Sequence, residues 1–182
     1  MYFTCFIGNE FSRKGKNMAK EASFDIVSEV NMQEVDNAFQ QCARELTQRY
    51  DLKQTGASIE FSKQDALFTI EAPSEFVASQ VIDVLRTKLA KRSIDLSALK
   101  VNKPQSASGA SVRQTASLIQ GISKEVSKKI AQDIRNLKLK CKAVVEGEKL
   151  RVSSASRDVL QSVIAALKDQ DYGQPLQFTN YR

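Results

Sequence analysis

The segment LKCKAVVEGEKLRV, residues 139–152, decides which fold this sequence can form. Apolar residues alternate with lysines through its first half, which is the period-two pattern of a strand with one buried face. Glu146-Gly147-Glu148 is typical of a turn, and Leu150 and Val152 continue the alternation on a returning strand. The segment therefore predicts a β-hairpin with one face packed on a core and the other face open.

Helical patterns lie on both sides of this hairpin. Before it, apolar residues recur every four positions from Val126 to Ile134, and after it Ser156 is placed to cap a further helix. Strand patterns lie further out, at residues 112–118 and 176–178. The resulting order is that of a ferredoxin-like βαββαβ domain, in which both helices cover one face of the sheet.

The first half of the chain repeats the pattern. Asp51-Leu52-Lys53 corresponds to Asn136-Leu137-Lys138 at an offset of 85 residues, and beyond the hairpin an offset of 82 aligns Ser74 with Ser156. Agreement in both hydrophobic pattern and cap position favours a duplication. The elements predicted for this half are a strand at 24–28, a helix capped by Asn31, strands at 57–61 and 68–72, a helix from 73–75 to Lys91-Arg92, and an edge strand at 99–101.

The sequence thus predicts an α+β protein with two tandem ferredoxin-like domains, whose antiparallel sheets carry helices on one face. Domain 1 is expected at residues 22–103 and domain 2 at 104–182, with the polar stretch 102–109 at their boundary. Residues 1–21 are expected to form an extension, in which Met18 is an alternative start. The pattern leaves open whether strands are exchanged between the halves.

Composition argues against most enzyme classes. The chain has no histidine, which excludes Ser-His and Cys-His nucleophile pairs and imidazole-bound zinc. Cys5, Cys42 and Cys141 are widely spaced, which favours a reducing compartment over a disulfide framework. No apolar run approaches the roughly 18–20 residues that span a bilayer. We therefore expect no catalysis, no metal, no cofactor and no membrane association.

Basic residues gather in the C-terminal half. Residues 104–182 carry 13 Lys/Arg against 7 Asp/Glu, whereas residues 22–103 carry 10 against 12. Strand alternation directs part of this charge to the open face of the hairpin, which predicts an anion-binding site. Its predicted residues are Lys138, Lys140, Lys142, Lys149, Arg151 and Arg157, and a second candidate group is Arg86, Lys91 and Arg92 at a helix end.

Both groups have another explanation. Lysines at alternate positions also protect an edge strand from aggregation, and cations at a helix end complement the helix dipole. The equivalent open face of the first half has no basic cluster, although it faces the same edge problem. This comparison favours anion binding for the hairpin, because edge protection alone would apply to both halves.

Several segments resemble the YajQ family of bacterial nucleotide-binding proteins. They are SFDIVSE (23–29), LAKRSI (89–94), IQGI (119–122), LKLK (137–140) and LQFTN (176–180), and the resemblance also extends to their order and spacing. It covers nearly all of the chain from Ser23 onward. One departure is Ser93, where members of the family usually carry glycine after the Lys-Arg pair.

The resemblance implies a tandem ferredoxin-like fold, a cytoplasmic location and no assigned catalysis. Members are associated with nucleotide and tRNA binding, and some act as cyclic di-GMP receptors that work with a transcription regulator. We therefore expect a non-catalytic receptor for cyclic di-GMP or a GTP-like nucleotide that acts through a partner. Two alternatives remain, a non-specific RNA- or tRNA-binding protein and a structural protein-interaction module.

Overall fold

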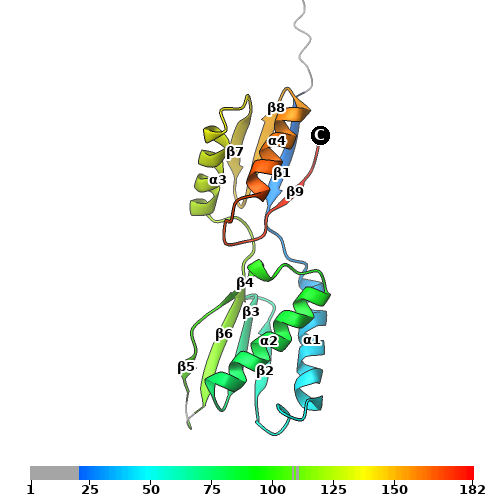
Figure 1. Cartoon of the computed structure of the whole chain (residues 1–182), viewed down its shortest axis with the longest axis vertical. Helices are drawn as coiled ribbons and strands as arrows, with labels where there is room; N and C mark the ends of the chain where they lie inside the picture. Colours follow the sequence, from blue (N-terminus) through cyan, green and yellow to red (C-terminus); the bar gives the residue numbers. More distant parts are fainter. Residues whose placement is uncertain (1–20, 108, 110) are drawn as a thin grey trace, which may run out of the picture.

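The computed structural model of the chain describes residues 21–107, 109 and 111–182. It contains two α+β units that lie end to end, each with a sheet and a pair of helices (Figure 1). The extension predicted at residues 1–21, with Met18, lies almost wholly outside the described residues. The predicted α+β class with two antiparallel sheets is confirmed.

The first unit comprises residues 29–118. Its sheet has the strand order β2-β3-β6-β4, and the short strand β5 also pairs with β6. A 3₁₀ turn at Leu96–Ala98 precedes β4. The elements are α1 (Met32–Gln48), β2 (Ser58–Ser62), β3 (Leu67–Ala72), α2 (Glu75–Lys91), β4 (Leu99–Val101), β5 (Gln105–Ser106) and β6 (Val112–Leu118).

The second unit comprises residues 22–28 together with 119–182. Its sheet has the order β7-β8-β1-β9, and all of its pairings are antiparallel. The elements are β1 (Ala22–Val27), α3 (Lys124–Asn136), β7 (Lys142–Glu146), β8 (Lys149–Ser154), α4 (Arg157–Lys168) and β9 (Gln177–Thr179).

Two strands are exchanged between the halves of the sequence. β1 pairs with β8 and β9 of the second unit, whereas β6 pairs with β3 and β4 of the first unit. Each unit has the ferredoxin-like strand arrangement, with its central strand supplied by the other half of the chain. The sheets therefore do not follow the sequence boundary at residues 103/104, because strand patterning specifies a buried face and not a pairing partner.

Helix starts follow the predicted caps. The Asn31 side chain accepts hydrogen bonds from the backbone N–H groups of Gln33 and Glu34, and Ser74 Oγ accepts one from Val77. Ser156 also precedes its helix as predicted, but its side chain makes no capping hydrogen bond. The first turn of α4 therefore lacks the side-chain cap that closes α1 and α2.

The strand predicted from residue 139 begins later. Cys141 N donates to Leu139 O at 2.9 Å, a tight turn that breaks the alternation, and β7 starts at Lys142. Leu139 and Cys141 still pack against the core of the second unit. Lys140, which was predicted to lie within the strand, is instead in the loop before it.

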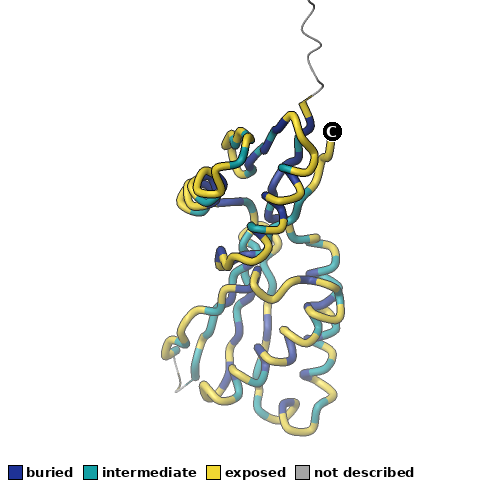
Figure 2. The backbone as a smooth tube through the Cα atoms, turned by 45° about the horizontal axis from the view of Figure 1, so that its top comes forward, coloured by how far each residue is buried: buried dark blue, intermediate teal, exposed yellow. Residues whose placement is uncertain are grey.

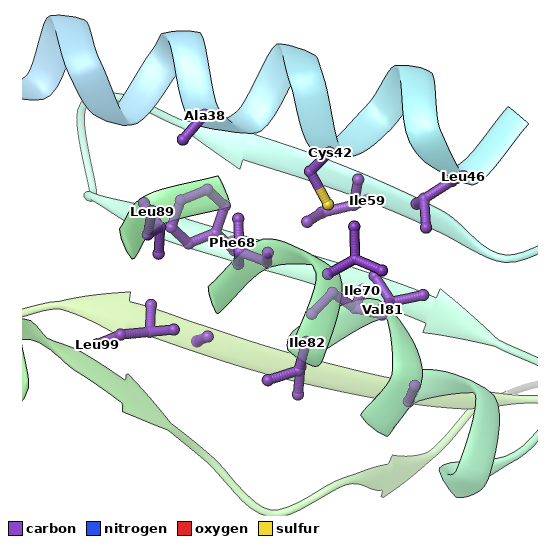
Figure 3. Close-up of a cluster of buried hydrophobic side chains, with 14 of the residues drawn as sticks. Ala38, Cys42, Leu46, Ile59, Phe68, Ile70, Val81, Ile82, Leu89 and Leu99 are labelled. Atoms are coloured by element: carbon purple, nitrogen blue, oxygen red, sulfur yellow. The ribbon is translucent and has the colours of Figure 1, made fainter. Parts of the chain in front are cut away.

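Each unit has its own hydrophobic core, and in Figure 2 the buried positions lie between the helices and the sheet. Figure 3 shows the first core, where Cys42 of α1 points toward Ile59 and Ile70 of the sheet. Burial raises the pKa of the Cys42 thiol to about 12. Phe68 is fully buried in the same core and stacks on Phe61 with ring centroids 4.5 Å apart.

We expect Phe68→Ala to lower the free energy of unfolding by about 3–5 kcal/mol, because it opens a cavity in this core. Phe76→Ala is the matched control, since the Phe76 ring is 72% exposed and its removal should change stability by less than about 0.5 kcal/mol. Urea denaturation of the parent and both variants measures the difference. Equal losses for the two variants would contradict the core assigned to Phe68.

The backbone at the end of α2 favours glycine at the position that Ser93 occupies in this chain. Ser93 has φ +58°, and its N–H bonds to Ala90 O while the N–H of Ile94 bonds to Leu89 O. This is a Schellman motif, whose left-handed position usually holds glycine because a Cβ is strained there. The buried Ile94 completes the motif with its apolar contact.

Ser93→Gly should therefore raise the free energy of unfolding, by roughly 0.5–1 kcal/mol, as it relieves the left-handed strain. Ser79→Gly, at an exposed site inside α2, should lower it by about 0.5 kcal/mol because glycine weakens a helix interior. Thermal or urea melts distinguish the two signs. A loss of stability in Ser93→Gly would contradict the motif.

Candidate functional site

The open face of the second sheet is set by strand pairing. β1 places Asp25 opposite Arg151 of β8 and Thr179 of β9, and β7 places Val144 on the other side of Arg151. Residues opposite one another on paired strands share a face of the sheet. Because Leu150 and Val152 point into the core, Lys149 and Arg151 lie on the open face, as strand alternation predicted.

Asp25 is at the centre of a charge network on this face. Arg151 donates two hydrogen bonds to it, from Nε to Oδ1 at 2.8 Å and from Nη2 to Oδ2 at 3.1 Å. Lys149 Nζ lies 3.4 Å from Asp25 Oδ2, and Asn180 Nδ2 donates to the same oxygen at 2.9 Å. Glu146 accepts from Arg151 Nη1 at 3.1 Å and lies 3.6 Å from Lys149 Nζ.

The network holds two cations and two carboxylates and is therefore balanced in charge. Asp25 is only 3% exposed, and the hydrogen bonds from Arg151 lower its pKa well below the usual value although burial opposes them. Lys149 and Arg151 thus have counter-ions within the chain. Sequence reasoning missed this because Asp25 reaches them through the strand exchange.

The other basic residues of this group gather at one end of the same sheet. Lys142 begins β7 opposite Ser153 and Arg157 begins α4. Lys138 follows the C-cap of α3, with φ +53°. Ser154 Oγ joins the two loops, since it donates to Lys140 O at 2.8 Å and accepts from Ser156 N at 3.2 Å. In Figure 1 this end lies at the top of the second unit.

We call Lys138, Lys140, Lys142 and Arg157 the cationic end. Within the described residues, none of these four side chains forms an ion pair with a carboxylate. Lys138, Lys140, Lys142 and Arg157 are also all exposed. An anion that approached this end would meet cations without an internal counter-ion.

A cavity of about 260 Å³ adjoins Arg157. Two backbone hydrogen bonds between Ser23 and Arg182, at 2.9 and 3.2 Å, hold the C-terminal segment along β1 and form one wall. Tyr181 of this segment is 61% exposed. The polar lining is Ser23, Arg157, Gln161, Tyr181 and Arg182, and the apolar lining is Ala22, Leu160 and Ile164.

Sequence reasoning did not identify Arg182 and Tyr181 as site residues. They follow the last strand, and no local pattern shows that they run beside the start of β1. The signal lies in the pairing of β1 with β9, which brings residues 22–23 next to the end of the chain.

Residues 22–182 match the family model of "Nucleotide-binding protein YajQ-like". The chain belongs to this family. The family predicted from the sequence segments is therefore confirmed, and the match begins where the first strand of the structure begins.

Bacterial relatives of the YajQ-like family cover most of the chain. A protein of Streptomyces coelicolor is 52% identical over 163 residues, which are 89% of this chain and 99% of that protein. One from Chloroherpeton thalassium is 48% identical over 165 residues, 91% of this chain and all of that protein. Both carry the name nucleotide-binding protein.

The second predicted group of the YajQ-like chain lies on the first unit. Arg86 Nη1 lies 3.5 Å from Asp83, and Arg92 Nη1 lies 3.1 Å from Glu34 of α1. Lys91 is exposed near the end of α2. The structure does not bring these residues together with the cationic end. The cationic end lies at the end of the second unit that points away from the first unit (Figure 1).

Among residues 21–107, 109 and 111–182, no group of His, Cys, Asp and Glu is placed to hold a metal ion. No helix described in these ranges is long and apolar enough to cross a membrane.

The Asp25 network predicts how stability depends on pH. The folded-state pKa of Asp25 is lowered, so its contribution is present above the ordinary pKa of 3.8 and is lost as pH falls below it. Asp25→Asn should lower the free energy of unfolding by on the order of 2 kcal/mol at pH 7, since Arg151 is partly hydrated. The difference from the parent should begin to shrink as pH falls below about 4 and should be smaller at pH 3 than at pH 7, as measured by urea denaturation.

Asp83→Asn serves as the control, because Asp83 is 68% exposed in its pair with Arg86. It should differ from the parent by less than about 0.5 kcal/mol at both pH values. If Asp25→Asn and the parent lost equal stability between pH 7 and pH 3, Asp25 would not have the role assigned to it.

Proposed function

We propose that the chain is a non-catalytic cytoplasmic receptor that binds a nucleotide at the cationic end and acts through a protein partner. The observation that supports this proposal best is the cationic end itself. Its cations have no internal counter-ions and lie next to the cavity between α4 and the C-terminal segment. The preferred ligand is cyclic di-GMP or a related guanine nucleotide, and the partner class is a transcription regulator. Family membership supports the nucleotide, since the matching proteins are named for that property.

The start of α4 suits a phosphate group. Backbone N–H groups in the first turn of a helix are unpaired and point toward a bound anion, which the helix dipole also favours. The Ser156 side chain makes no capping hydrogen bond, so it does not occupy these donors. Arg157 in the same turn adds a planar guanidinium that can bind phosphate through two hydrogen bonds.

The adjoining cavity suits a base. Its apolar wall is formed by Leu160 and Ile164, and the exposed ring of Tyr181 offers a stacking surface at its rim. Arg182 lines the same cavity, and an arginine can donate to both O6 and N7 of guanine. The combination of an apolar wall with two arginines favours a nucleotide over free phosphate.

The open sheet face gives less support to RNA recognition by base stacking. Among the residues that the structure describes there, β1, β7, β8 and β9 contribute no aromatic side chain. Sheets that read single-stranded RNA stack bases on aromatic residues of this face. RNA would therefore be bound through its phosphates at the cationic end.

We expect the double variant Lys142→Ala/Arg157→Ala to bind cyclic di-GMP about 100-fold more weakly than the parent in 150 mM salt. Each charge-assisted contact to phosphate accounts for about tenfold. The control Lys53→Ala/Lys100→Ala removes the same charge from exposed residues of the first unit and should leave the affinity unchanged. Calorimetric titration measures all three proteins, and the parent dissociation constant is expected to be micromolar or lower.

Unchanged affinity in Lys142→Ala/Arg157→Ala would contradict the proposed site. Titration of a short RNA at several salt concentrations separates the alternatives, because a non-specific RNA binder loses affinity steeply as salt rises. If no nucleotide bound and a protein partner were still recovered, the chain would be a structural interaction module instead.

A further inference from the structure

β7 is an edge strand of the second sheet, and its outer side is uncovered. Among the strands that the structure describes, it pairs with β8 alone, along its whole length from Lys142 to Glu146. Val144 and Val145 in this strand are 40% and 46% exposed. An exposed apolar edge is a template for another strand, because its outer backbone N–H and C=O groups are left without strand partners.

The first unit protects its equivalent edge strand, whereas the second unit does not. Glu60 is the middle residue of β2 and lies opposite Thr69, and Val144 is the middle residue of β7 and lies opposite Arg151. A charge in the middle of an edge strand opposes pairing with a second copy, because like charges would then lie side by side. Val144 presents no such barrier, which favours a role for the β7 edge in pairing.

The hairpin turn determines which residues of β7 face the free edge. A two-residue loop follows β7, and Glu146 pairs with Lys149 across it. Gly147 begins this loop with φ +65°, as the tight turns of such hairpins require. The pair that closes the turn is hydrogen-bonded, and bonded and non-bonded pairs alternate along an antiparallel ladder. The backbone groups of Ala143 and Val145 therefore point away from β8, toward the outer side.

β7 is complementary to a second copy of itself in one antiparallel register. When Val144 of one copy lies opposite Val144 of the other, Ala143 of each copy faces Val145 of the other, and these residues have the outward backbone groups. Lys142 of each copy then faces Glu146 of the other, so opposite charges meet at both ends. Neighbouring registers either set bonding residues against non-bonding ones or place Val144 opposite a charged residue.

We propose that the protein forms a two-fold homodimer in which the β7 strands of two copies pair antiparallel around Val144. The second sheets of the two copies then become one continuous sheet. Val144 meets its counterpart on the open face, whereas Ala143 meets Val145 on the face that carries the helices. The dimer therefore covers the exposed valines with apolar side chains and gives the outer backbone groups hydrogen-bond partners.

The charges at the two ends of β7 remain able to pair in this way. Glu146 Oε1 accepts a hydrogen bond from Arg151, whereas Glu146 Oε2 lies 3.6 Å from Lys149 Nζ, which leaves Oε2 able to accept from Lys142 of the other copy. Lys142 belongs to the cationic end, and its pairing leaves the other three cations of that end for an anion. Because the strands run antiparallel, the two cationic ends lie apart, and the dimer forms without nucleotide.

The test is sedimentation velocity of the full chain without nucleotide, over a range of protein concentrations in about 150 mM NaCl. One pair of short strands makes a small interface, so we expect a reversible dimer with a dissociation constant on the order of 10 μM. Val144→Glu copies the charge that protects β2 and should leave the chain monomeric. The control Lys100→Glu introduces a glutamate at an exposed position of β4 in the other sheet and should dimerise like the parent.

The register has a test of its own. Lys142→Glu and Glu146→Lys each turn both opposite-charge pairs of the dimer into like-charge pairs. Each variant alone should therefore dimerise about tenfold more weakly than the parent. An equimolar mixture of the two variants should recover the affinity of the parent, because every glutamate at these positions then faces a lysine.

Three outcomes would overturn the proposal. They are a parent that stays monomeric at about 1 mM, a Val144→Glu variant that dimerises like the parent, and a mixture that associates no more tightly than its components. Circular dichroism establishes that each variant folds. If Glu146→Lys does not fold because Arg151 loses its partner, the contrast between Val144→Glu and Lys100→Glu decides.

Discussion

The antiparallel pairing of β1 with β8 is the interaction on which the rest of the second unit depends. β1 comes from the start of the described chain, yet it is the central strand between β8 and β9. Its inward residues Phe24 and Ile26 are fully buried in the core, and its outward Asp25 binds Arg151. A single strand therefore completes the core on one face and neutralises charge on the other.

This pairing also distributes charge along the sheet. Residues 22–28 and 119–182 together carry 12 Lys/Arg and 8 Asp/Glu, whereas residues 29–118 carry 11 of each, so the second unit remains the basic one. Within it the centre of the sheet is balanced by Asp25 and Glu146, cations gather where β7 begins, and carboxylates gather where it ends. The two ends of β7 therefore present charges of opposite sign to the solvent.

Much of the candidate site's composition could be predicted from the sequence, but the grouping of its residues could not. Alternation correctly placed Lys149 and Arg151 on the open face, since side chains of a strand point alternately to its two sides. It did not reveal that Asp25 and Glu146 would neutralise them. The charges that share a sheet face with a strand depend on which strand pairs beside it, and alternation does not specify that partner. Arg182 and Tyr181 were missed for the same reason, as they adjoin Arg157 only through the contact of the chain end with β1.

The sequence by itself determined the local elements and the fold class. Hydrophobic period, the caps at Asn31 and Ser74, and the turn at Glu146-Gly147-Glu148 act over a few residues, so they can be read without knowledge of the fold. Tertiary structure alone decided which sheet receives β1 and β6, which cations keep internal counter-ions, and where the cavity beside Arg157 lies. The physical reason is that strand pairing joins residues more than 120 positions apart, as in Asp25 with Arg151, and such contacts depend on the whole chain.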